Sequence, residues 1–321
     1  MRLILAGGVV GSVVLLATGQ GVVQTPPAGP LAPYILTSEN GAYVDWLDGH
    51  VGVRGTTTIS RRIAQNRVFY LQTKTSAEAQ GHARMMTLIA GLPRDGRTLL
   101  GSDEALKTRI GERIGNEKAA EIMRDTGPIF EVLVKTPLWG PDSLIHLVLG
   151  EPVPVRTVPA ITTAGVSAMP ATTPGDGPTG LIVDARDLDG PAAALLPRIL
   201  DEMGHLIHSL DSADPAEVRE RGLVAYAVSP HGVNPVSGGL RQGDRPMMVK
   251  AVSSAGATRA DLIIRQTDAD RIAAAASAPA FLRECRVIIL MSSPAPQTPR
   301  PVPHLTRGPE RKPSAADPNL N

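Results

Sequence analysis

The sequence predicts an α+β fold organised as two small α+β domains, and three observations support this prediction. Both halves of the chain mix apolar runs of strand length with amphipathic segments of helical period. A stretch rich in proline and threonine, residues 151–178, separates the two halves as a linker. Apolar residues make up 42% of the chain and aromatic residues only 3%, so both cores must rest on aliphatic side chains.

The N-terminus predicts export. A short positive start precedes residues 3–23, which carry no charge, as in a secretory signal. Cleavage is expected near Ala17 or Gly19, which leaves a signal peptide at 1–24 and a proline-rich linker at 25–39. An uncleaved membrane anchor is the alternative, because about 20 apolar residues can cross a bilayer.

Residues 40–150 are expected to form the first domain. Apolar side chains four residues apart, such as Leu106 and Ile110, favour a helix. Val132 and Val134 follow the alternation of a half-buried strand. In order, the expected elements are extended structure over 43–59, helices over 76–92 and 103–124, and a strand within 128–149.

Residues 179–292 are expected to form the second domain. Asp214 and Pro215 are typical of a helix start, and the segment from Asp201 to Gly204 is typical of a tight turn. In order, the expected elements are a strand at 180–185, a hairpin over 198–208, a helix at 214–221, strands at 223–229, 246–253 and 261–265, a helix at 267–278 capped by Thr267, and a buried strand at 286–291.

Two segments outside these elements are also informative. Residues 293–321 are rich in proline and poor in large apolar residues, which predicts a disordered tail. The loop at 229–246 is long for a compact domain, and long loops are often functional. We interpret it as an interaction loop, with these candidate contact residues: His231, Asn234, Arg241, Asp244 and Arg245.

The carboxylates that follow the first strand of the second domain have two interpretations. Asp184 could act as an acid–base catalyst, or it could pair with Arg186 or Arg198 or cap a turn. Asp184 does not share a strand face with Asp187 and Asp189, and a cation site needs several oxygens on a defined loop. We therefore favour the structural pairing.

The histidines and the cysteine give no site either. His205 and His208 suggest a metal pair, but an odd spacing places them on opposite faces of a strand, so we expect no metal. Cys285, the only cysteine, lies beside an apolar run and is expected to be a small buried residue rather than a nucleophile. An exported chain with one cysteine has no internal disulfide framework.

Several function classes are disfavoured. The net charge of +1, without a basic stripe, argues against nucleic acid as a partner. Phosphate-binding glycine loops, the nucleophile elbow of serine hydrolases and the zinc-binding His-Glu-x-x-His motif are all missing. These absences disfavour an enzyme without excluding one, and the expectation of no cofactor and no enzymatic activity rests on the family that the chain resembles.

Five segments of the second domain carry a resemblance. They are TGLIVDARDL at 179–188, LLPRILDEMGHLIHS at 195–209, GLVAYAVS at 222–229, RPMMVKAVSSAGATRADLIIRQTDADRI at 245–272 and FLRECRVIIL at 281–290. In the first domain, TGPIFEVLVKTPLWGPDSLIHLV adds to them. Together they resemble a bacterial envelope family, the twenty-kilodalton lipoproteins and the FlgP- and FlgT-like flagellar assembly proteins. The chain lacks the acylated cysteine of many relatives, so the resemblance implies a non-lipidated member with a lipoprotein-like first domain.

The resemblance implies a periplasmic or outer-membrane-associated protein with a structural or assembly role, linked to the flagellum. Its partners would be envelope or flagellar basal-body proteins or further copies of itself, in contact through strand edges and the loop at 229–246. Two alternatives stay open. One is a periplasmic protein that binds a small ligand between its domains. The other is a hydrolase that uses Asp184 with His205 or His231.

Overall fold

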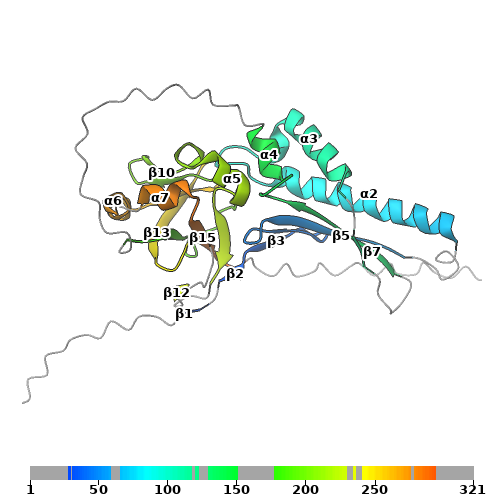
Figure 1. Cartoon of the computed structure of the whole chain (residues 1–321), viewed down its shortest axis with the longest axis horizontal. Coiled ribbons are helices and arrows are strands. Elements are labelled where there is room, and N and C mark those ends of the chain that lie inside the picture. Colours follow the sequence, from blue (N-terminus) through cyan, green and yellow to red (C-terminus); the bar gives the residue numbers. More distant parts are fainter. Residues whose placement is uncertain are drawn as a thin grey trace, which may run out of the picture.

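The structure, a computed structural model of the chain, describes residues 28–29, 31–58, 66–117, 120–122, 129–150, 177–229, 234–235, 241–275 and 278–293. Within these residues the fold is α+β, as the sequence predicts. A five-stranded and an eight-stranded sheet each carry helices, and a short strand pair, β1 (Ala28–Gly29) with β12 (Asn234–Pro235), lies apart from them (Figure 1). The predicted signal peptide, the linker at 151–176 and the tail from 294 lie outside the described residues.

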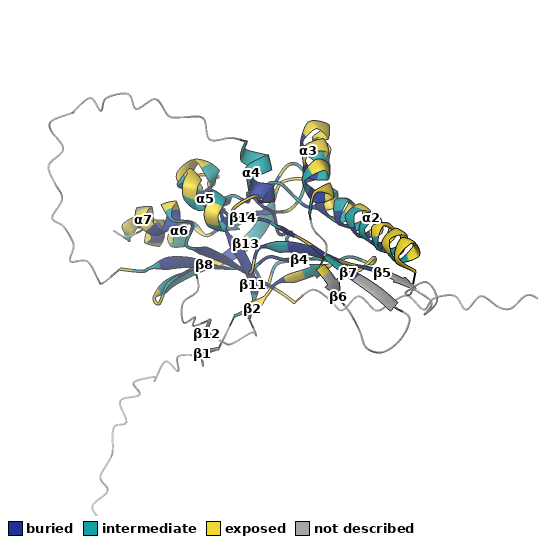
Figure 2. Cartoon of the chain, turned by 45° about the vertical axis from the view of Figure 1, so that its right-hand side comes forward, coloured by how far each residue is buried: buried dark blue, intermediate teal, exposed yellow. Residues whose placement is uncertain are grey.

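The first domain is an antiparallel sheet with one long helix across it. Helix α2 (Arg67–Gly91) packs on strands β5 and β7 through residues spaced by four, Ala77, Gly81, Met85 and Ile89, which form its buried stripe (Figure 2). The strand order is β3-β4-β5-β7-β6. The bounds are β3 (Ile35–Thr37), β4 (Ala42–Asp45), β5 (His50–Thr58), β6 (Ala120–Ile122), β7 (Ile129–Pro137), η1 (Leu100–Ser102), α3 (Glu104–Gly115) and α4 (Leu144–Leu149).

Two boundaries in this domain differ from the prediction. Helix α2 begins nine residues before the predicted start at 76, because Asn66 caps it: its Oδ1 accepts from the first N–H groups of the helix at 3.0 and 3.4 Å. Helix α3 stops at Gly115 rather than 124, and residues 120–122 form strand β6 against β7. Strand β7 lies within the predicted segment 128–149, and helix α4 follows it.

The second domain is built on an eight-stranded sheet in the order β10-β9-β14-β13-β8-β15-β11-β2. Its centre is four mutually parallel strands, β13, β8, β15 and β11. The bounds are β2 (Ala32–Pro33), β8 (Gly180–Asp184), β9 (Ile199–Asp201), β10 (Leu206–His208), β11 (Ala225–Val228), β13 (Pro246–Ala255), β14 (Asp261–Ile264), β15 (Val287–Met291), η2 (Leu210–Ser212), α5 (Pro215–Arg221), α6 (Gln266–Ala274) and α7 (Ala278–Arg283).

The sequence predicted these elements well. The hairpin and the Asp214-capped helix are confirmed, and each predicted strand is present within three residues of its expected bounds. The bounds and the cap of helix α6 differ from the prediction. It starts at Gln266 with Arg265 at the cap position and ends at Ala274, so Thr267 is not the cap and the helix does not reach 278.

Three of the four central strands, β8, β15 and β11, are buried on both faces. Leu181 and Val183 of β8 join the large core together with helices α5, α6 and α7, whereas Ile182 points to the other face. On that face it meets a smaller cluster, Ala225, Ala227, Ile288 and Leu290, with Leu31, Leu47 and Met248 at its margin. Burial on both faces is typical of parallel strands and explains why they read as unbroken apolar runs.

The segment predicted as an N-terminal linker is partly strand. Strand β2 pairs antiparallel with β11 at the edge of the eight-stranded sheet, and β3, one residue later, joins the five-stranded sheet. The prediction of a linker over 25–39 is therefore wrong for residues 32–37. The prolines of the surrounding segment favour a linker, yet a proline such as Pro33 is tolerated on an edge strand.

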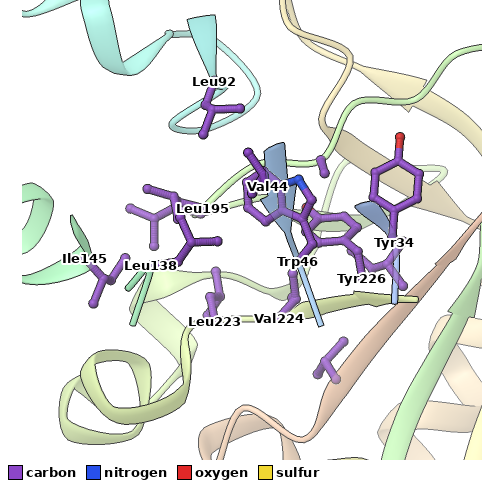
Figure 3. Close-up of a cluster of buried hydrophobic side chains, with 14 of the residues drawn as sticks. Tyr34, Val44, Trp46, Leu92, Leu138, Ile145, Leu195, Leu223, Val224 and Tyr226 are labelled. Atoms are coloured by element: carbon purple, nitrogen blue, oxygen red, sulfur yellow. The ribbon is translucent and has the colours of Figure 1, made fainter. Parts of the chain in front are cut away.

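The two domains share one core (Figure 3). Trp46 of the first domain and Tyr226 of the second meet edge to face, with ring centroids 5.3 Å apart. The Tyr226 hydroxyl donates to the Ala194 carbonyl at 3.1 Å and accepts from the Ala194 N–H at 2.9 Å. Helix α4 of the first domain also lies beside α5 of the second (Figures 1 and 2). Side chains from both domains thus pack into a continuous apolar interior.

In the part of the chain that the structure describes, no helix has both the length and the apolar character needed to cross a membrane. The predicted signal segment falls outside that part.

Candidate functional site

A cleft lies where the two domains meet, with a volume of about 430 Å³. The first domain lines it with the loop after α2 and the end of α4, and the second domain with the segment before β9 and the turn after β10. The lining residues are Arg94, Asp95, Gly96, Arg97, Val148, Leu149, Leu196, Arg198, Ser209, Leu210 and Asp211.

Asp95 organises the first-domain wall of the cleft. Its Oδ1 accepts from the N–H groups of Arg97 and Thr98 at 2.8 and 2.9 Å, and its Oδ2 accepts from Arg94 Nε at 3.1 Å. Burial acts to raise the pKa of Asp95, but these hydrogen bonds outweigh it, and the pKa lies below its ordinary value. Asp95 is therefore ionised and fully occupied in holding its own loop.

The same loop is tied to the second domain. The Leu196 N–H donates to the Arg94 carbonyl at 2.8 Å, and the Thr258 hydroxyl donates to the Asp95 carbonyl at 2.7 Å. Gly256, with φ of 84°, approaches Gly96 so closely that a Cβ would collide with the Gly96 carbonyl. These contacts fix the loop against its neighbour, so the two walls of the cleft form one rigid unit.

Arg198 forms the second-domain wall together with a buried partner. Its Nε donates to Asp261 Oδ2 and its backbone N–H to Asp261 Oδ1, both at 3.0 Å. Asp261 is fully buried, so its charge is compensated by this arginine. These hydrogen bonds hold the start of β9 beside β14. The charge of Arg198 at the cleft is compensated by Asp261.

Two charged side chains of the lining lack a partner among the described residues. Arg97 and Asp211 are both exposed, and neither guanidinium nor carboxylate forms an ion pair or hydrogen bond there. The lining also includes four apolar side chains, Val148, Leu149, Leu196 and Leu210. The cleft thus offers groups for binding a ligand by charge and by apolar contact.

Asp184 is held in an ion pair, as the sequence analysis favoured. Arg186 donates two hydrogen bonds to this carboxylate, from Nε to Oδ1 at 2.8 Å and from Nη2 to Oδ2 at 2.6 Å. Arg186 Nη1 donates to the Ser229 carbonyl at 3.1 Å. Burial acts to raise the pKa of Asp184, but the hydrogen bonds and charge of Arg186 prevail and the pKa is lowered. Nearby, Asp187 pairs with Lys250 at 2.6 Å.

His205 and His208 lie in different surroundings: His205 precedes strand β10, and the pairing register of the hairpin shifts between Leu206 and His208. His205 is exposed, with Nδ1 2.9 Å from Asp201 Oδ2. His208 is buried, with Nε2 3.3 Å from the Leu223 carbonyl, and burial lowers its pKa to about 4. Arg186 engages Asp184 and Asp201 engages His205, so these two side chains are not partners of each other among the described residues. His231, the other histidine considered for a hydrolase, lies outside those residues.

The structure describes only part of the predicted interaction loop. His231 lies outside the described residues, and Asn234 contributes backbone pairing in β12. Asp244 and Arg245 are exposed. The guanidinium of Arg241 lies over Trp139 of the first domain, 5.5 Å from the ring centroid.

Cys285 is buried, as predicted. Burial raises the pKa of its thiol to about 12, so the group is a neutral thiol at neutral pH and a poor nucleophile.

The cleft residues were not singled out in the sequence. The only local signal was Pro-Arg-Asp-Gly at 93–96, a turn after a helix. Asp211 and Arg198 lie more than a hundred residues further along the chain. Their approach depends on how the domains dock, which no local pattern encodes.

Comparison with known proteins relates part of the chain to a described domain. Residues 180–293 match the family model for Tp0624 of Treponema pallidum, second domain. This range agrees within one residue at each end with the second domain expected from the sequence. No curated protein matches the chain. The second domain is thus similar to a domain of a bacterial protein.

Proposed function

We propose that this is a non-enzymatic, exported cell-envelope protein with a structural or assembly role, located in the periplasm or at the outer membrane. Within that role, we propose kinship with the twenty-kilodalton lipoproteins and the FlgP- and FlgT-like flagellar assembly proteins. The export-type N-terminus and the segments quoted above support the location and the kinship. The match to a bacterial second domain is compatible with both.

The observation that carries the proposal is the shared core. Tyr226, Trp46 and the loop at 93–98 join the domains by apolar packing and by backbone hydrogen bonds. Domains that close around a substrate need an interface that slides or bends, whereas a component of a permanent assembly benefits from a fixed shape. A fused two-domain body suits the second role.

The sheet edge at β10 is the contact surface that we assign to a partner. Edge strands present unpaired backbone groups that another chain can extend. Leu206 and Met203 beside this edge are 51% and 73% exposed, which is high for large apolar residues. The opposite edge, β2, has two residues and ends in Pro33, which has no N–H to donate. The exposed residues Asp244 and Arg245 of the 229–246 loop remain candidate contacts.

Site-specific photo-cross-linking tests this proposal. Because Cys285 is buried, a Leu206→Cys variant presents one reactive thiol for benzophenone-4-maleimide. Glu104→Cys, at a side chain 80% exposed on α3, is the matched control. We expect irradiated cells to yield adducts of the Leu206→Cys protein with envelope or basal-body proteins, or with a second copy. Adducts absent from both variants, or identical in both, would contradict the assembly role assigned to this edge.

A further inference from the structure

We propose that the interdomain cleft is a binding site for short zwitterionic peptides with aliphatic side chains. The geometry that carries this inference is the placement of Arg97 and Asp211, one from each domain, in one apolar-lined cavity of about 430 Å³. Ligand sites commonly have volumes of roughly 300–1,000 Å³, so the cleft is of suitable size. The inference does not depend on the proposed assembly role.

The walls of the cleft are preorganised. Asp95 holds its loop through Arg97 and Thr98 backbone N–H groups, and Thr258 ties that loop to the second domain. Arg198 is fixed by Asp261. A ligand therefore meets a site whose shape is already set, and binding need not order the loop, which removes an entropic cost of association.

The charges of the lining select the ligand's polar groups. Asp95 and Asp261 already compensate Arg94 and Arg198. Arg97 and Asp211 have no such partner among the described residues. A guanidinium binds a carboxylate through two parallel hydrogen bonds, and a carboxylate accepts from an ammonium group. A molecule with a free carboxylate and a free ammonium group satisfies both, whereas a molecule with only one leaves the other charge unmet.

The apolar part of the lining selects the rest of the ligand. Val148 and Leu149 come from the end of α4, and Leu196 and Leu210 come from the second domain. All four are aliphatic and at least partly buried. An aliphatic side chain between the two charged termini would cover these surfaces and gain from their removal from water.

Calorimetric titration of the full chain with the dipeptide Leu-Leu tests the inference. We expect saturable binding. Acetylation of the peptide's amino terminus, or amidation of its carboxyl terminus, should each weaken binding at least tenfold. Arg97→Ala and Asp211→Ala should each weaken Leu-Leu binding by a similar factor, and Arg109→Ala, at an exposed arginine on α3, is the matched control.

The variants also assign each terminus. In Arg97→Ala, amidation should no longer weaken binding, because the carboxylate has lost its partner, and in Asp211→Ala the same should hold for acetylation. The inference is overturned if the unaltered chain shows no saturable binding at millimolar Leu-Leu. It is also overturned if blocked and free peptides bind equally, or if both variants bind like Arg109→Ala. None of these outcomes affects the cross-linking result expected for β10.

Discussion

At the scale of single residues, His208 makes the stability of the fold depend on pH. The ring is buried, and burial lowers its pKa from 6.5 to about 4. Between these pH values the unfolded chain binds a proton that the folded chain does not, so this contribution is complete above pH 6.5 and is lost as pH falls toward 4. The loss is on the order of 3 kcal/mol, at about 1.4 kcal/mol per pKa unit.

A His208→Gln variant should remove this dependence while retaining a donor that reaches toward the Leu223 carbonyl. We expect the free energy of unfolding, from urea titrations at pH 7.5, 5.5 and 4.5, to fall less steeply with acid than in the unaltered protein. His205→Gln, at an exposed histidine of the same hairpin, should keep the steep fall. An equal acid response in all three proteins would contradict the assignment to His208.

At the scale of elements, helix α2 contains a glycine that its packing does not require. Gly81 lies in the buried stripe, and a Cβ there would meet Val134 and Val53 at 3.4 and 3.6 Å, which are ordinary contact distances. Glycine costs a helix interior about 0.5–1 kcal/mol relative to alanine. Gly81→Ala should therefore stabilise the protein by about that amount, as measured by urea unfolding.

The opposing strand provides the contrast for this prediction. Gly55 of β5 lies directly under α2, and a Cβ there would collide with the Ala77 carbonyl. Gly55→Ala should therefore be destabilising, because strand and helix must move apart. Stabilisation by Gly55→Ala, or destabilisation by Gly81→Ala, would show that the helix does not lie on the sheet as described.

Helix α2 also illustrates what local sequence can and cannot reveal. Its buried stripe at Met85 and Ile89 was predictable because the period is helical. Its first two turns were missed because Val68, Phe69 and Tyr70 favour strands, and only the Asn66 cap signals helix. In the second domain, continuous apolar runs gave clear strand signals, so its elements were predicted closely. The cleft was not predictable, because its residues meet only through domain docking.

At the scale of the whole molecule, the shared core predicts a single cooperative unit. Both tryptophans, Trp46 and Trp139, belong to the first domain. Both also contact the second domain, so their fluorescence reports on the first domain and on its contact with the second, while circular dichroism reports on both domains. If the interior is continuous, the two signals should change together in denaturant, the usual test of two-state unfolding.

A core substitution in the second domain tests whether the two domains unfold together. Ile264 of β14 is fully buried and belongs to the shared core, and truncation of such a residue costs about 2–5 kcal/mol. Ile264→Ala should move the tryptophan transition as far as the dichroism transition, because the first domain cannot remain folded when its partner unfolds. Ile110→Ala in α3 is the reciprocal variant and should move both by a similar amount. A tryptophan transition unmoved by Ile264→Ala would mean that the domains unfold separately. The fixed two-domain body on which the assembly proposal rests would then be lost.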